Sequence, residues 1–134
     1  MTTKIAIDTN VLVYVHDKTA DEKSSIAKEL LVSEPYLSTQ VLSEYLNVLR
    51  RLLKITKVDL LTKSTIWLDG CIIFAVSLNT LKKAATLAEK YDFQLFDAII
   101  VASALEAECT VLYSEDMQHN QVIEGKLTIV NPFL

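Results

Sequence analysis

Apolar residues follow two patterns along this chain, short continuous runs and longer stretches with helical spacing. The runs predict strands, because a strand buried on both faces of a parallel sheet is apolar throughout. We expect strands at residues 4–7, 36–37, 72–76, 110–113 and 127–130, with 72–76 and 110–113 fully buried. The helical spacing predicts helices at residues 21–32, 40–53, 58–68, 81–91 and 97–107.

Helices that alternate with apolar strands predict an α/β fold. The expected architecture is a three-layer α/β/α sandwich with a central, mainly parallel sheet of about five strands. A capping-box spacing from Thr56 to Asp59 marks the start of the third helix. With 134 residues, 51% of them hydrophobic, and no repeat or linker, the chain is expected to form a single domain over residues 1–134.

Composition excludes several classes of function. Only two glycines are present, Gly70 and Gly125, so neither a glycine-rich phosphate loop nor a dinucleotide fingerprint can form. Cys71 and Cys109 lack zinc-site spacing and are expected to be buried free thiols. A net charge of -4 opposes general attraction to nucleic acid, so any such role needs a local site. Without an apolar leader or span, the chain is expected to be cytoplasmic.

Four acids stand where the predicted fold would place its chemistry, since ligands of an open parallel sheet bind beyond the carboxyl ends of its strands. Asp8 directly follows the first strand, and Asp116 follows the strand that ends at Tyr113. Asp97 stands at the mouth of an otherwise apolar helix, and Glu44 lies at the edge of another helix's apolar stripe. Taken singly, each also has an ordinary reading, as a helix cap, a first-turn acid, a turn residue or a solvated helix residue.

Carboxylates held close together repel, so a cluster of them is tolerated mainly where protons or hard cations neutralise it. Oxygen-only ligands favour Mg²⁺ or Mn²⁺ over softer metals. Such ions suit phosphodiester hydrolysis, because they activate water and screen the phosphate. A filled acidic pocket would accept phosphate, which reconciles a net-acidic chain with a phosphodiester substrate.

Four segments resemble motifs of the PIN-domain family, in particular of the VapC-type toxin ribonucleases of VapBC toxin–antitoxin systems. They are IAIDTNVLVY at 5–14, STQVLSEY at 38–45, LFDAIIVASA at 95–104 and VLYSEDM at 111–117. Their order and approximate spacing match along nearly the whole chain. Asn120 and Leu46 stand where the family often has a glycine and an aromatic residue, and neither change removes an acid.

The resemblance implies a PIN-like fold and an Mg²⁺- or Mn²⁺-dependent endoribonuclease, the toxin of a type II pair. It implies one pocket that binds the metal and catalyses cleavage, formed by Asp8, Glu44, Asp97 and Asp116. Supporting polar neighbours would be Thr9, Asn10 and Ser114. It also implies an RNA substrate, a cognate antitoxin protein, a homodimer and no membrane association.

A basic patch just beyond the Glu44 helix is a candidate RNA-binding surface. It comprises Arg50, Arg51, Lys54 and Lys57. The alternative is a solvated helix end, where cations favour the helix dipole. His16 and His119 are expected to be surface or hydrogen-bonded residues, since metal-bound water needs no imidazole base, and Glu115 to be an ordinary surface acid.

Three other functions stay open from the sequence. A housekeeping RNA-processing nuclease would share the site, and the neighbouring genes would distinguish it from a toxin. A non-catalytic PIN-fold binding module would be expected to lose acids, whereas this chain keeps all four. A phosphohydrolase with Asp8 as covalent nucleophile needs a second aspartate two residues on, where Asn10 stands. Metal-assisted hydrolysis does not itself distinguish RNA from DNA, so only the resemblance favours RNA.

Overall fold

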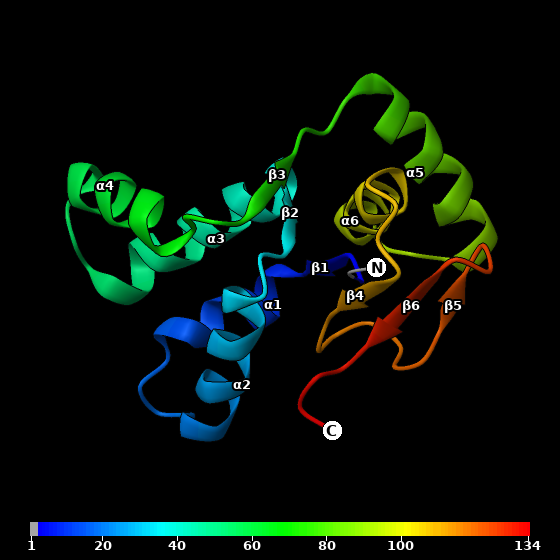
Figure 1. Cartoon of the computed structure of the whole chain (residues 1–134). Coiled ribbons are helices and arrows are strands. Elements are labelled where there is room, and N and C mark those ends of the chain that lie inside the picture. Colours follow the sequence, from blue (N-terminus) through cyan, green and yellow to red (C-terminus); the bar gives the residue numbers. More distant parts are fainter. Residues whose placement is uncertain (1–2) are drawn as a thin grey trace.

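The computed structural model describes residues 3–134, which form a six-stranded sheet with helices on both sides (Figure 1). The strands are β1 (Ile5–Ile7), β2 (Tyr36–Ser38), β3 (Ile72–Phe74), β4 (Val111–Tyr113), β5 (Val122–Ile123) and β6 (Leu127–Val130). They lie in the order β3-β2-β1-β4-β6-β5, and every neighbouring pair is parallel except β5 with β6. The parallel strands therefore end at one common edge of the sheet.

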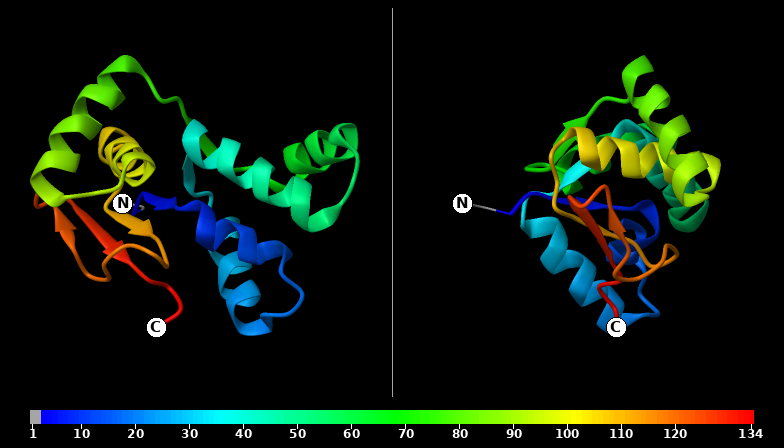
Figure 2. Two further views of the ribbon diagram at one scale, coloured as in Figure 1. Left: turned by 180° about the vertical axis from the view of Figure 1, so that it is seen from behind. Right: turned by 90° about the vertical axis from the view of Figure 1, so that its right-hand side faces the viewer.

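The helices confirm the predicted three-layer sandwich. They are α1 (Thr9–Leu12), α2 (Asp21–Val32), α3 (Thr39–Leu53), α4 (Lys57–Trp67), α5 (Leu78–Tyr91) and α6 (Leu95–Glu106), with a 3₁₀ turn, η1 (Val13–His16), after α1. Helices α1 to α4 lie on one side of the sheet and α5 and α6 on the other (Figure 1, Figure 2). No helix of residues 3–134 is both long and apolar enough to span a membrane.

Five elements differ from the sequence prediction: α1, η1, β5, α5 and β3. Helix α1 and the turn η1 were not expected, because four-residue helices are too short to show a periodic pattern. Strand β5 has only two residues and pairs antiparallel with β6, so the sheet has six strands rather than about five. Helix α5 begins at Leu78, three residues early, because Ser77 and Thr80 form a capping box there.

Strand β3 is less buried than its sequence predicts. The apolar run at 72–76 indicates a fully buried strand, but β3 spans only Ile72–Phe74 and lies at the edge of the sheet. The side chains of Ile72 and Ile73 are 44% and 46% exposed. An apolar run does not distinguish a central strand from an edge strand with an uncovered face, which is why this prediction is wrong.

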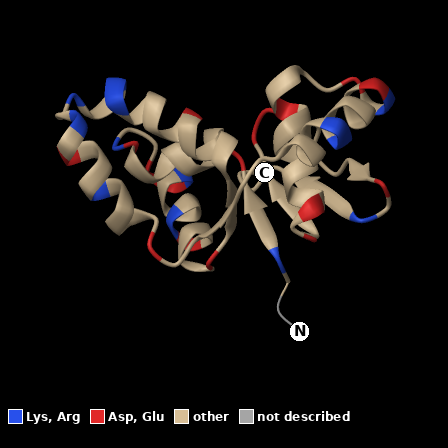
Figure 3. Cartoon of the chain, turned by 90° about the horizontal axis from the view of Figure 1, so that it is seen from above, with Lys and Arg blue, Asp and Glu red and all other residues tan. Residues whose placement is uncertain are grey.

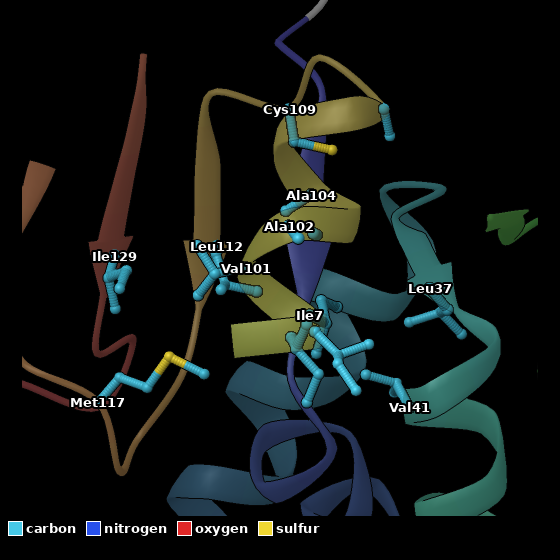
Figure 4. Close-up of a cluster of buried hydrophobic side chains, with 14 of the residues drawn as sticks. Ile7, Leu37, Val41, Val101, Ala102, Ala104, Cys109, Leu112, Met117 and Ile129 are labelled. Atoms are coloured by element: carbon cyan, nitrogen blue, oxygen red, sulfur yellow. The ribbon is translucent and has the colours of Figure 1, made fainter. Parts of the chain in front are cut away.

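Helix α6 forms the centre of the core. Every residue from 98 to 105 in this helix is buried, so only its first turn and its last residue, Glu106, reach solvent. Figure 4 shows Val101 of α6 in one cluster with Ile7 of β1 and Leu112 of β4. The core continues to Cys109, which is buried, whereas Cys71 is only half-buried. Both thiols are free, and burial raises the pKa of each to about 11, so neither is a ready nucleophile.

Candidate active site

One pocket of about 470 Å³ gathers side chains from four separate segments of the chain. Its lining includes the four acids that the sequence singles out: Asp8, Glu44, Asp97 and Asp116. Asp8 follows β1, and Asp116 follows β4. The other two lie on α3 and on the first turn of α6. The pocket thus stands beyond the carboxyl ends of the central strands, where the sheet topology predicts it.

Asp8 is held by both its backbone and its side chain. Its N–H donates to the Tyr113 carbonyl oxygen at 2.9 Å, beside the β1–β4 pairing. Carboxylate oxygen Oδ1 accepts from the Thr9 N–H at 2.7 Å. The other oxygen, Oδ2, accepts from Ser114 Oγ at 2.9 Å and from Asn10 Nδ2 at 3.3 Å. Asp8 is therefore both the N-cap of α1 and a fixed part of the pocket lining.

The surroundings of Asp8 disfavour its charge. Burial raises the pKa of Asp8 to about 6, although hydrogen bonds from Ser114 and Thr9 oppose the rise. The negative charges of Asp97 and Glu44 raise it further. Only 4% of Asp8 is exposed. A buried carboxylate beside other acids is costly without a counter-charge, and such perturbed groups are concentrated at functional sites.

Helix α3 presents one polar face to the pocket. Glu44, Asn47, Val48 and Arg51 line it at the spacing of one helix face. Glu44 Oε1 accepts from Thr9 Oγ1 at 3.3 Å, which links α3 to the end of β1. Burial raises the pKa of Glu44, and the charge of Asp97 adds to the rise against hydrogen bonds from Thr9 and Gln40.

The remaining two acids are more open. Asp97 occupies the third position of α6, where the N-terminal dipole favours a carboxylate. Its pKa is nevertheless raised, first by burial and then by the charge of Asp116. Asp116 itself is exposed. Both residues can therefore meet a ligand that enters from solvent.

The donor chemistry of this pocket fits a hard divalent cation, since all four acids offer oxygen ligands. In residues 3–134 no group of three or more Asp, Glu, His or Cys side chains is placed so that it could hold a metal ion by itself. Mg²⁺ commonly binds proteins through only one or two carboxylates and keeps several waters. Asp8 and Asp97, with the neighbouring Glu44 and Asp116, are the residues that would hold it.

A family model described as PIN domain matches residues 5–124 of the chain, a span that contains all four acids. The chain belongs to the PIN-domain family. No curated protein sequence matches it significantly.

Solved structures share the fold of this PIN domain at low sequence identity. A toxin–antitoxin complex from Klebsiella pneumoniae is 20% identical with a TM-score of 0.70, covering 97% of this chain and 98% of that one. VapC20 of Mycobacterium tuberculosis, described as a sarcin–ricin loop cleaving toxin, is 20% identical with a TM-score of 0.65, covering 84% and 90%. VapBC2 from Rickettsia felis, bound to a DNA fragment from its promoter, is 18% identical with a TM-score of 0.64, covering 95% and 97%.

Glu115 of this PIN domain is more than an ordinary surface acid. Its carboxylate accepts from Tyr14 Oη at 2.7 Å and pairs with the Lys23 ammonium. Its backbone N–H donates to Asn10 Oδ1 at 3.1 Å, while the amide of Asn10 reaches Asp8. Burial alone would raise the pKa of Glu115, but hydrogen bonds from Lys23 and Tyr14 hold it below the ordinary value. Glu115 therefore ties the loop after β4 to η1 and α2.

One residue of the predicted basic patch belongs to the pocket lining. Among its members, Arg51 lines the pocket, whereas Arg50 donates to Asn47 Oδ1 at 3.0 Å and Lys54 ends α3 in a left-handed conformation. Lys and Arg positions are spread over both helical layers in Figure 3. His16 Nε2 lies 2.6 Å from the Tyr45 hydroxyl, away from this lining, as expected for a hydrogen-bonded histidine.

Proposed function

We propose that this PIN domain is an Mg²⁺- or Mn²⁺-dependent endoribonuclease. The observation that carries the proposal is one pocket that joins four acids from distant segments, one of them buried with a pKa raised to about 6. Such a lining is costly when empty and favourable around a hard cation. The fold shared with VapC20, a toxin described as cleaving the sarcin–ricin loop, supports RNA as the substrate.

The reaction would be hydrolysis of an RNA phosphodiester bond. A bound divalent ion would supply an activated water and a counter-charge for the phosphate. Ser114, Asn10 and Thr9 keep the Asp8 carboxylate oriented by hydrogen bonds to both of its oxygens. Arg51 is the only positively charged side chain among the described lining residues, and its guanidinium suits phosphate oxygens.

Cleavage of total RNA by the purified protein tests this proposal. Wild type should cut with Mg²⁺ or Mn²⁺ and not with EDTA, whereas Asp8→Asn and Asp97→Asn should each lose at least about a hundredfold in rate. Asn79→Ala, on the exposed surface of α5, is the matched control and should cut like wild type. Equal activity in wild type and both aspartate variants would identify a contaminant and favour a binding module.

We further propose that the nuclease is the toxin of a type II toxin–antitoxin pair in the cytoplasm, with a cognate antitoxin as partner. Shared fold with proteins of two toxin–antitoxin complexes supports this. Expression of wild type alone should arrest growth, Asp8→Asn should be tolerated, and a small DNA-binding protein encoded beside it should restore growth. Full growth with wild-type protein present would favour a housekeeping nuclease.

Exposed apolar side chains support contact with another protein chain. A groove of about 370 Å³ between α3, α4 and β3 has a mainly aliphatic lining that includes Leu42, Leu46, Leu61, Leu68 and Ile73. Ile72 continues it along the edge strand. We propose a homodimer in solution, to be measured by light scattering during size-exclusion chromatography. Ile73→Lys should reduce the dimer mass to that of a monomer if this edge is the contact.

A further inference from the structure

A second pocket, of about 520 Å³, adjoins the acidic one. Asp97 and Asp116 line both pockets, so the two hollows form one groove with these acids at its middle. The second pocket is built from the end of α5, the start of α6 and the loop that follows β4. A polymeric ligand that lies along the groove would pass from the acidic pocket directly into the second pocket.

Neutral amides dominate the polar lining of the second pocket. Three of the four glutamines in the chain, Gln94, Gln118 and Gln121, lie there. Gln94 and Gln118 are exposed, and within residues 3–134 none of the three side chains makes a hydrogen bond to the protein. Each amide therefore offers a donor and an acceptor to a ligand.

Two aromatic rings and Met117 form the apolar part of the same pocket. Tyr91 and Phe93 are partly exposed, with ring centroids 5.9 Å apart. The Tyr91 hydroxyl accepts a hydrogen bond from the Glu124 N–H at 3.0 Å, which fixes this ring against the β5–β6 turn. Flat rings beside amides are the chemistry with which proteins bind unpaired bases.

Charge divides the groove into two parts. The lining of the second pocket contains Asp92, Asp97 and Asp116 and, among its described residues, no Lys or Arg, so it disfavours backbone phosphates. The acidic pocket instead contains Arg51. With the proposed metal bound beside Arg51, the acidic pocket would favour phosphate, whereas the second pocket favours an uncharged group.

We propose that the second pocket is a nucleobase subsite, which holds an unpaired base of the RNA next to the scissile phosphate. Gln94 and Gln118 read the edge of the base, and Phe93 contacts its face. The proposal rests on the proposed ribonuclease function for the identity of the substrate. What it adds is the class of ligand: the second pocket binds a base rather than a phosphate or a protein segment.

Binding of mononucleotides tests the subsite without any cleavage. In EDTA, the four nucleoside 5′-monophosphates and, separately, ribose 5-phosphate are titrated to about 10 mM into labelled wild-type protein, and the side-chain NH₂ signals of the glutamines are followed by NMR. We expect at least one mononucleotide to shift the signals of Gln94 and Gln118, with ribose 5-phosphate leaving them in place. No shift by any mononucleotide, or an equal shift by ribose 5-phosphate, overturns the proposal whether or not the protein cuts RNA.

Cleavage-site preference gives the second test. Wild type is given a pool of RNA oligonucleotides with random bases. At one position beside the cut, we expect it to prefer one base over the others by about tenfold. Gln118→Ala and Gln94→Ala should each reduce the preference at this position to below threefold, while Asn79→Ala keeps it. Wild-type cleavage with no preference at any position contradicts the subsite alone. Absence of all cleavage contradicts the proposed function and leaves the binding result to decide the subsite.

Discussion

At the scale of single residues, Asp8 joins two properties that usually conflict. It caps α1 through the Thr9 N–H, and it lies buried beside two other acids. Burial would favour the protonated form, while three hydrogen bonds to its oxygens support the charged one. A nearby positive charge would therefore shift Asp8 towards its ionised form.

Asp8 should make the metal-free protein less stable as pH rises. Its folded pKa of about 6 lies above the ordinary value of 3.8, so the native state holds a proton that the unfolded chain releases between about pH 4 and 6. Stability from this group is present at low pH and lost through that window, by about 3 kcal/mol at most. Asp8→Asn removes the loss.

Urea unfolding in EDTA measures this effect at pH 4.5 and pH 7.5. The free energy of unfolding of Asp8→Asn minus that of wild type should be larger at pH 7.5 by about 1–3 kcal/mol. Taking the difference cancels titration of the groups that do not interact with Asp8. A difference that is the same at both values of pH would show that Asp8 ionises as freely as in the unfolded chain.

Positions after strands singled out Asp8 and Asp116, and helix positions together with the family resemblance singled out Asp97 and Glu44, but not all of their partners were predicted. Asn47 shares a helix face with Glu44, so its three-residue spacing could have identified it, whereas Arg51, seven residues on, was already named as part of the basic patch. Glu115 carries no local signal, because Tyr14 and Lys23 are about a hundred positions away. The glutamines of the second pocket come together only through the packing of α6 and the loop after β4.

At the scale of elements, the loop after β4 is the part of the site with the least regular structure. Ser114 Oγ accepts from the Met117 N–H at 3.3 Å while donating to Asp8, and Glu115 anchors the same loop to Tyr14 and Lys23. These contacts therefore hold the loop residues before Asp116 in place, although Asp116 itself is exposed.

Glu115→Ala should loosen this loop and weaken metal binding. Loss of the hydrogen bonds from Tyr14 and Lys23 should raise the Mg²⁺ concentration for half-maximal cleavage about three- to tenfold. The control is Glu124→Ala, which removes the comparable Lys90–Glu124 ion pair but lines neither pocket. If Glu115 had only a structural role, both variants would have a lower melting temperature, and both would need the same Mg²⁺ concentration for half-maximal cleavage.

The capping box of α5 should contribute to stability independently of the site. Ser77 Oγ accepts from the Thr80 N–H at 3.3 Å, and Thr80 Oγ1 accepts from the Ser77 N–H at 3.0 Å. Ser77→Ala should lower the free energy of unfolding by about 1 kcal/mol in urea titrations. Ser25→Ala, at an exposed position inside α2, should cause no comparable loss.

Long elements were predictable, α3 and α5 because their periodic patterns match their buried faces, and α6 because its apolar run is too long for a strand. The short elements were not. Helix α1 depends on the cap from Asp8, and β5 depends on pairing with β6, so both are set by contacts rather than by local pattern. The exposure of β3 depends on its place at the sheet edge, which the run at 72–76 does not encode.

At the scale of the whole molecule, an ion that binds the native pocket should stabilise the entire fold. Saturating Mg²⁺ is expected to raise the melting temperature of wild type by roughly 3–8 °C at pH 7.5. Asp97→Asn should lose more than half of the shift, and Glu124→Ala should retain it. An unchanged wild-type melting temperature at 10 mM Mg²⁺ would count against metal binding regardless of the RNA assay.

The order of the pocket's parts along the chain has a consequence for synthesis. The first acid stands at position 8 and the last at position 116, and β4, which precedes the last, lies between β1 and the late strand β6. A ribosome-bound chain that lacks its final segment holds the acids without the sheet that assembles them. A chain that ends before β6 should therefore carry all four acids without forming the pocket that joins them.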